Sequence, residues 1–182
     1  MTIVTALFAD GILATGHNDG TSIGDTSLPI SERKWVSFGD WMLGISGESA
    51  AQAALEHDAG KIDAGTTDPF ALCGMLKQRL VDNGIWRKPK RDSVMSFGIF
   101  CVLAHRSGLV WDVDNKFTLT AVPEGTLCAR GSGMDFALGA AHALRQMRDM
   151  PGAEEQVRIA TEAAVAHDVY CPGKAVITVV RY

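Results

Sequence analysis

The sequence opens with Thr2-Ile-Val-Thr-Ala-Leu7, reaches Asp10-Gly11, and continues with Ile12-Leu-Ala-Thr15. Both apolar runs contain β-branched residues, which favour strands over helices. The Asp-Gly pair between them suits the two-residue turn of a hairpin, in which the turn positions take positive φ angles. The start of the chain therefore predicts two antiparallel strands. The stretch that follows, residues 17–25, is polar and glycine-rich and predicts a loop.

Beyond this hairpin, strands and helices come in blocks. The expected order is strands 34–38 and 41–46, helices 48–59 and 69–80, a solvated basic connector 86–92, strands 94–105 and 110–123, helices 134–150 and 153–169, and a closing strand 176–180. Asp68 before Pro69 is typical of a helix N-cap. Because the blocks exclude regular βαβ alternation, the pattern predicts an α+β fold with two antiparallel sheets flanked by helix pairs. A length of 182 residues fits a single domain, 1–182.

Composition limits the function classes. Apolar residues make up 47% of the chain, charged residues 21%, and the net charge is −4, which is typical of a globular protein. No apolar run is long enough for a membrane span, and the first basic residue is Arg33, so we expect neither membrane insertion nor a signal peptide. The sequence has no block of basic residues of the kind that binds nucleic acids, so we do not expect nucleic-acid binding. Neither the four cysteines nor the five histidines show metal-ligand spacing, so we expect reduced thiols in a cytoplasmic protein, without metal or cofactor.

Thr2 is the first candidate for chemistry. Threonine is small enough to permit removal of Met1, which would leave a hydroxyl and a free α-amine on one residue. The amine has an ordinary pKa of about 7.7–8.0, so its neutral fraction at pH 7 can accept the hydroxyl proton. Small residues at position 2 are common, so this signal needs support. Lys34 would lower the pKa of the amine as a fixed cation, and Asp19 would hold the lysine in place.

Further short motifs follow Thr2 in a fixed order along nearly the whole chain. They are Asp10-Gly11, Ile23-Gly24-Asp-Thr26, Arg33-Lys34, Gly44-Ile-Ser-Gly47 before an Ala-rich helix, Gly131-Ser-Gly133 before residues 136–144, and Asp168-Val-Tyr-Cys-Pro-Gly173. Together they resemble the proteasome β-type peptidases of the N-terminal nucleophile hydrolases, in particular HslV and related bacterial homologues. No single motif is specific to that family, whereas their order and spacing are.

The resemblance implies a four-layer α-β-β-α sandwich and a threonine endopeptidase. Such subunits form stacked homo-oligomeric rings that degrade unfolded polypeptides, with an ATP-dependent unfoldase as partner. Thr2 would be the nucleophile, with Lys34 beside it, and the backbone N–H of Gly47 would bind the oxyanion. Ser132 would shuttle the proton of the amine and Asp168 would support both groups. The alternative role for Ser132 is a helix N-cap.

Two positions depart from the family pattern. By strict count the acidic partner of the lysine would stand at Asn18, whereas the acid comes one residue later. We expect Asp19 to be the partner, because a neutral amide compensates a buried charge poorly. Cys171 stands where the family usually has serine, and a thiol is the weaker hydrogen-bond partner. Two other functions stay open: a catalytically inactive ring subunit, if Met1 is retained, and a non-peptidase amidohydrolase of the same fold.

Overall fold

The computed structural model describes the chain except for residues 1, 24–25, 29–32, 63–64, 88–93 and 182. Met1 and most of the basic connector 86–92 therefore lie outside the described residues. Within the part described, no helix is long and apolar enough to cross a membrane.

The first sheet contains the N-terminal hairpin. Its strands are β1 (Ile3–Ala9), β2 (Ile12–Asn18), β10 (Cys128–Gly131) and β11 (Ala175–Arg181), in the antiparallel order β10-β1-β2-β11. The predicted Asp10-Gly11 turn is confirmed, with φ angles of 51° and 71°. This turn fixes the register, so that Val4 lies opposite His17 and the N–H of Ile3 reaches the side chain of Asn18.

The second sheet contains five antiparallel strands in sequence order. They are β5 (Trp35–Phe38), β6 (Trp41–Gly47), β7 (Ile99–His105), β8 (Val110–Val113) and β9 (Leu119–Val122). A separate short hairpin, β3 (Thr21–Ile23) and β4 (Thr26–Leu28), follows β2.

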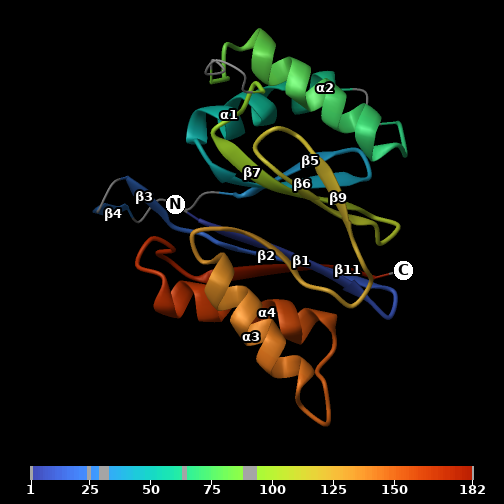
Figure 1. Ribbon diagram of the computed structural model, residues 1–182, viewed down its shortest axis with the longest axis vertical. Helices are drawn as coiled ribbons and strands as arrows, with labels where there is room; N and C mark the ends of the chain where they lie inside the picture. Colours follow the sequence, from blue (N-terminus) through green and yellow to red (C-terminus); the bar gives the residue numbers. More distant parts are fainter. Residues whose placement is uncertain (1, 24–25, 29–32, 63–64, 88–93, 182) are drawn as a thin grey trace.

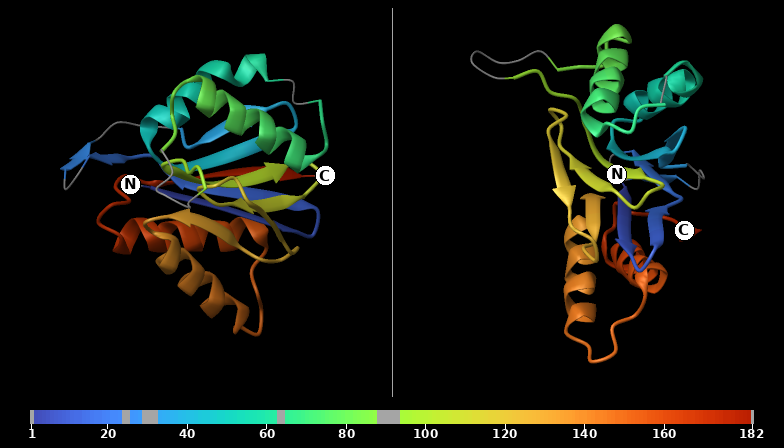
Figure 2. Two further views of the ribbon diagram at one scale, coloured as in Figure 1. Left: turned by 45° about the horizontal axis from the view of Figure 1, so that its top comes forward. Right: turned by 90° about the vertical axis from the view of Figure 1, so that its right-hand side faces the viewer.

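Helices cover the outer face of each sheet (Figure 1). The helices α1 (Ser49–Asp58) and α2 (Pro69–Asp82), joined through the short 3-10 helix η1 (Ala59–Lys61), lie on the second sheet. The helices α3 (Met134–Arg145) and α4 (Ala153–His167) lie on the first sheet. The views in Figure 2 show the same four layers, α-β-β-α, as the sequence predicts. The predicted N-cap of α2 is also confirmed, because Asp68 Oδ1 accepts the N–H of Phe70 at 2.9 Å.

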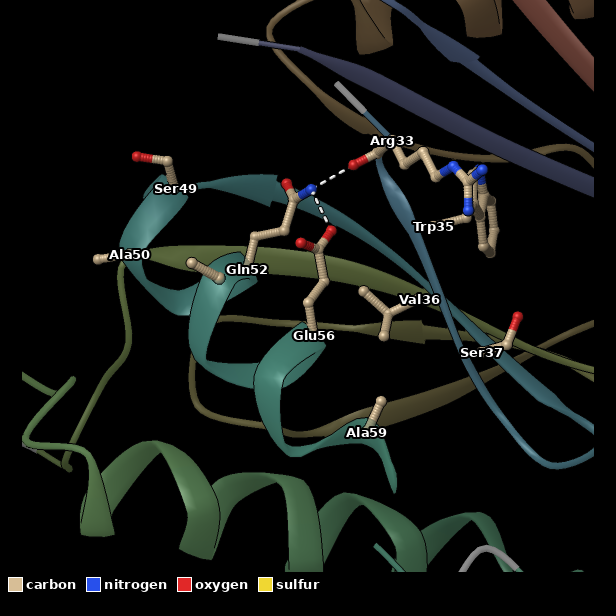
Figure 3. Close-up of a pocket in the computed structure, with 10 residues that line it drawn as sticks. Arg33, Trp35, Val36, Ser37, Ser49, Ala50, Gln52, Glu56 and Ala59 are labelled. Carbon is tan, nitrogen blue, oxygen red and sulfur yellow. Dashed lines mark hydrogen bonds between the residues drawn. The ribbon is translucent and has the colours of Figure 1, made fainter. Parts of the chain in front are cut away.

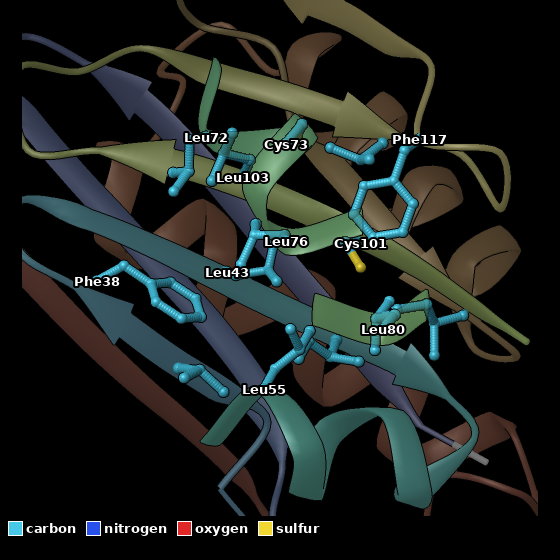
Figure 4. Packing of buried hydrophobic residues seen from close by; sticks show 14 of the residues in the cluster. Phe38, Leu43, Leu55, Leu72, Cys73, Leu76, Leu80, Cys101, Leu103 and Phe117 are labelled. Carbon is cyan, nitrogen blue, oxygen red and sulfur yellow. The ribbon is translucent and has the colours of Figure 1, made fainter. Parts of the chain in front are cut away.

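The side chains of β1 point alternately to the two faces of the first sheet, and each face contributes to a different hydrophobic core. Ile3 and Leu7 pack against α3 and α4, whereas Val4 and Ala6 pack between the sheets. A third core lies between the second sheet and α1 and α2, where leucines of the helices meet Phe38 and Leu43 (Figure 4). Thr2 comes two residues before Val4, so by the same alternation its side chain lies on the face of the first sheet that points toward the second sheet.

Several local predictions are wrong. Residues 110–123, expected as one strand, form the two strands β8 and β9. Residues 17–25 are not one loop, because His17 and Asn18 complete β2 and two short strands follow. Residues 128–131 form strand β10, which the sequence analysis did not identify. Gly133, not Ser132, is the N-cap residue of α3, so the capping role of Ser132 is excluded.

Candidate active site

Thr2 lies immediately before β1. Its side chain is buried, with an exposed fraction of 5%. Its carbonyl accepts the backbone N–H of Ser132 at 2.9 Å, directly after β10. Gly131 has a φ of 121° and lies so close to that carbonyl that a Cβ atom would collide with it. The backbone at the end of β10 therefore packs directly against the backbone of Thr2, the nucleophile candidate.

Asn18 is the side chain that holds the hydroxyl of Thr2. Thr2 Oγ1 donates to Asn18 Oδ1 at 2.6 Å, and the N–H of Ile3 donates to the same oxygen at 2.9 Å. Asn18 Nδ2 donates to the carbonyls of Gly20 and Pro172 at 2.9 and 3.0 Å. Because backbone groups surround both ends of the amide, its orientation is fixed. A carboxylate here would point one oxygen at two carbonyl oxygens, so the surroundings suit asparagine.

Asp19 points toward another segment. Its Oδ1 accepts the N–H of Lys174 at 2.7 Å, and its own N–H donates to the carbonyl of Lys174 at 3.0 Å. Asp19 thus holds the loop that precedes β11. Its expected pairing with Lys34 stays a prediction, whereas Asn18 is the residue that contacts Thr2. The turn at Asp10-Gly11 could have identified Asn18, because counting outward from a two-residue turn pairs it with Ile3.

Lys34 is buried, with an exposed fraction of 4%, whereas Arg33 is exposed. The charge of Lys34 reaches His17, a residue that the sequence analysis did not single out. The pKa of His17 falls from its ordinary 6.5 to about 4, chiefly because of burial and secondly because of the nearby Lys34 ammonium, with Asp19 acting in the opposite direction. His17 is therefore neutral at pH 7, and the buried positive charge in this part of the inter-sheet layer belongs to lysine.

Ser132, Cys171 and Asp168 form a chain of polar groups behind Thr2. Ser132 Oγ lies 3.5 Å from Cys171 Sγ, which donates to Asp168 Oδ2 at 3.1 Å. Asp168 Oδ1 accepts the N–H of Tyr170 at 2.9 Å. Burial acts to raise the pKa of Asp168, but hydrogen bonds from Ser132, Tyr170 and Cys171 outweigh it and lower that pKa. Burial raises the pKa of the Cys171 thiol to about 12, so the thiol stays protonated and can donate.

A cleft of about 310 Å³ opens beside Thr2. Three predicted residues line it together: Thr2, Gly47 and Ser132. Gly47 ends β6, two residues before α1 begins, and has a φ of 124° that glycine adopts easily. Asp168 adjoins this group through Cys171, whereas Asp19 and Lys34 are not among the described residues that line the cleft.

A larger cleft of about 780 Å³ lies between β5 and α1 (Figure 3). Gln52 spans it by donating to the carbonyl of Arg33 and, at 2.9 Å, to Glu56 Oε1. The described lining includes none of the six predicted site residues. The smaller cleft is therefore the candidate active site, because it holds the hydroxyl of Thr2, the nucleophile candidate, next to a strand-to-helix turn.

The depressed pKa of His17 gives a pH prediction. The unfolded chain binds a proton at His17 between pH 6.5 and about 4, while the folded chain resists it, so stability falls as the pH falls through this window. We expect His17→Gln to lose less of its Tm over this window than the unmodified chain. The difference should be a few degrees, since 1 kcal/mol shifts Tm by about 2–4 °C at this size. His142→Gln, on the exposed face of α3, is the control, and equal Tm losses in both variants would contradict the assignment.

Comparison with known proteins gives matches among solved structures alone. No family model and no curated protein matches the sequence. The structure of Thiobacillus denitrificans BPH in complex with epoxomicin matches with a TM-score of 0.82 and 19% identity, covering 98% of each chain. A second structure of Thiobacillus denitrificans BPH matches with a TM-score of 0.82 and 20% identity, covering 98% of this chain and 97% of BPH. Eukaryotic HslV from Trypanosoma brucei matches with a TM-score of 0.71 and 17% identity over 99% of each chain. The overall arrangement of this chain is thus shared with these proteins from end to end.

Proposed function

We propose that this chain, which has the α+β sandwich fold of HslV and similar proteasome-like proteins, is a threonine peptidase of the N-terminal nucleophile type. The observation that carries the proposal is the environment of Thr2. Its hydroxyl is held by Asn18 in the wall of a cleft that also contains Gly47 and Ser132. The likeness to BPH and HslV supports the same reading through the fold.

In the proposed mechanism, removal of Met1 gives Thr2 a free α-amine. Thr2 Oγ attacks the carbonyl carbon of a peptide bond while the amine takes the hydroxyl proton. The tetrahedral oxyanion accepts a hydrogen bond from the backbone N–H of Gly47. The intermediate collapses as the protonated amine passes its proton to the leaving nitrogen, which leaves an ester on Thr2. Water activated by the same amine then hydrolyses the ester and regenerates the hydroxyl.

The surrounding side chains have separate roles in this scheme. The carbonyl oxygen of the Asn18 amide is too weak a base to take the proton, so Asn18 orients the Thr2 hydroxyl. Lys34 supplies a buried positive charge that favours the neutral form of the nearby amine. Ser132 and Asp168 support the amine through the polar chain that includes Cys171.

Confinement accompanies this chemistry in the proposal. We infer that copies of the chain close into rings that enclose the cleft, since an open peptidase would digest its surroundings and closed heterologous contacts are a standard route to rings. Unfolded polypeptides are the proposed substrates, and an ATP-dependent unfoldase in the cytoplasm is the proposed supplier.

The test of the proposal measures intact mass and peptide hydrolysis on the same preparations. We expect the rate to scale with the fraction of chains that begin at Thr2, because Met1 would turn the amine into a non-basic amide nitrogen. Light scattering on those samples reports ring formation. Full activity in a sample in which every chain retains Met1 would overturn the mechanism and point to another nucleophile.

Lys34 gives a second prediction, with its neighbour as the control. Lys34→Met keeps the apolar stem of the side chain but removes the buried charge, so we expect peptide hydrolysis to fall by about a hundredfold. Arg33→Met removes an exposed charge, and we expect less than a threefold change. Circular dichroism should confirm that both variants fold. Equal losses would mean that the strand presents the wrong residue to the site.

A further inference from the structure

Glu48 stands between Gly47 and helix α1 and is the N-cap residue of that helix. A carboxylate at such a position is stabilised when it accepts the free backbone N–H groups of the first turn, yet the Glu48 side chain makes no capping bond. Its Oε1 instead accepts a hydrogen bond from Arg87 Nη2 at 2.5 Å, 39 residues further along the chain. The reason for this orientation therefore lies outside α1.

Both the backbone and the side chain of Glu48 contact Gly98. This glycine comes directly before β7 and lines the cleft beside Thr2. The N–H of Glu48 donates to the carbonyl of Gly98 at 3.0 Å. The carboxyl group of Glu48 occupies the place of a side chain at Gly98, because a Cβ atom there would collide with Cδ and Oε1 of Glu48.

Arg87 is attached to the same short segment through its backbone. Its N–H donates to the carbonyl of Ser96 at 2.8 Å, in an isolated antiparallel bridge. Because Ser96 is two residues from Gly98, three hydrogen bonds connect Arg87, Glu48 and residues 96–98 in a closed circuit. The charged pair thus holds this segment from the outer side.

The hydrophobic core holds the segment independently from the inner side. Phe97 is buried, its N–H donates to the carbonyl of Asn115 at 2.8 Å, and its ring centre lies 5.1 Å from that of Phe117. The side chains of Arg87 and Glu48 are 65% and 45% exposed, and ion pairs of such exposure contribute little to folding. Loss of the pair should therefore leave the fold intact and affect local geometry instead.

The local geometry in question is that of Gly47. Gly47 lies opposite Ile99 between β6 and β7, and the bond from Glu48 N–H to Gly98 makes this a non-hydrogen-bonded pair. The N–H of Gly47 consequently points away from β7. Gly47 also lines the cleft beside Thr2. The backbone that carries the proposed oxyanion donor is therefore fixed on one side by Glu48.

We propose that Glu48, anchored by Arg87, is a positioning residue that holds the turn from β6 to α1 so that the Gly47 N–H meets the oxyanion. This role rests on the proposed function, because the oxyanion forms only if the chain cleaves peptides. The anchoring contact itself can be measured without catalysis.

The kinetic test uses chains that begin at Thr2. Glu48→Ala should lower kcat on a fluorogenic peptide about tenfold and change KM less than twofold, because only the developing oxyanion loses a well-placed donor. Arg87→Met should lower kcat about threefold, and the double variant should lose no more than Glu48→Ala alone, since both residues act through one contact. Glu48→Gln keeps an oxygen for Arg87 and should restore kcat to within about threefold of the unmodified chain.

A peptide aldehyde and the matching peptide alcohol separate positioning from general damage. Thr2 Oγ forms a bond to the aldehyde carbon, and the hydroxyl proton moves to the former carbonyl oxygen, which then lies at the oxyanion position; the alcohol forms no such bond. Glu48→Ala should weaken the aldehyde about tenfold and leave the affinity of the alcohol within twofold. Asp40→Ala is the control: it breaks an exposed pair with Arg106 at 3.6 Å, next to the other end of β6, and should change neither affinity.

Hydrogen exchange followed by mass spectrometry tests the contact apart from activity. In Arg87→Met, the N–H of Glu48 should exchange at least threefold faster, and unchanged exchange would overturn the anchoring role of Arg87. Turnover with an unchanged kcat in Glu48→Ala, or equal losses for aldehyde and alcohol, would keep the peptidase and overturn the positioning role. Neither turnover nor aldehyde binding by the unmodified chain would overturn the peptidase, and faster exchange in Arg87→Met would then uphold the anchoring contact alone.

Discussion

Replacing Thr2 with alanine should lower peptide hydrolysis by about a thousandfold or more, because in the proposed mechanism the Thr2 hydroxyl supplies the attacking oxygen next to its own proton-accepting amine. The fold should tolerate the change. Asn18 Oδ1 would keep the N–H of Ile3 as a donor, and the carbonyl of residue 2 would keep the N–H of Ser132. The loss should therefore appear in kcat, with Tm shifted by only a few degrees.

Thr2→Ser is the matched control. Serine keeps a hydroxyl that can donate to Asn18 and, after Met1 removal, the same amine, so we expect activity within about tenfold of the original. Initial rates on a fluorogenic peptide and intact mass should be measured for both variants. Hydrolysis by the alanine variant within tenfold of the unmodified chain would rule Thr2 out as the nucleophile.

Asn18→Asp is expected to lower activity by about a hundredfold at neutral pH, although the family pattern would suggest a carboxylate there. One carboxylate oxygen would face the carbonyls of Gly20 and Pro172, where Nδ2 now donates. Asn18 is fully buried, so the new charge could not be relieved by water. If the carboxylate turns to avoid these carbonyls, the Thr2 hydroxyl loses the fixed acceptor that orients it, and buried polar groups left without partners cost about 1–3 kcal/mol each.

The pH dependence of this variant tests that explanation. Burial and facing carbonyls should raise the pKa of the introduced carboxyl, so the folded state would bind a proton more tightly than the unfolded state. The stability deficit of Asn18→Asp should therefore shrink as the pH is lowered toward the ordinary carboxyl range, near 4. Asp19→Asn, the opposite change one residue on, keeps an acceptor for Lys174 N–H and should show no such recovery of stability as the pH is lowered. An Asn18→Asp variant more active than the original would show that the site lacks a carboxylate partner for Lys34.

Signals from neighbouring residues in the sequence were sufficient to predict many of the strands and helices of the sandwich. The Asp10-Gly11 turn and the Asp68-Pro69 helix start depend on neighbours along the chain, and both were predicted. The end of β2 was missed because Gly16, Asn18 and Gly20 disfavour strands by composition. In the fold, Gly16 gives α4 its closest approach, since a Cβ atom there would collide with Thr161 and Thr5. That packing is invisible to any window of sequence.

The candidate site likewise has residues that the sequence predicts and contacts that only the fold reveals. Thr2, Gly47 and Ser132 were predicted, and they line one cleft. The pairing of Asp19 with Lys34 stays a prediction, whereas the contact of Asn18 with Thr2 could not be predicted from charge, because it depends on the carbonyls of Gly20 and Pro172. Those carbonyls come from two segments separated by 152 residues (20 and 172), and only the register of β2 against β1 and β11 brings them together.

The anchoring of Thr2 also bears on when the proposed peptidase would become active. Its described hydrogen bonds, through the hydroxyl to Asn18 and through the carbonyl to Ser132, involve atoms that cutting the Met1–Thr2 bond leaves in place. A freshly synthesised precursor would thus already hold its nucleophile in the working position, unlike zymogens that must rearrange a loop after cleavage. Maturation would then need no refolding step, and the delay between synthesis and activity would be set by the aminopeptidase that trims the chain.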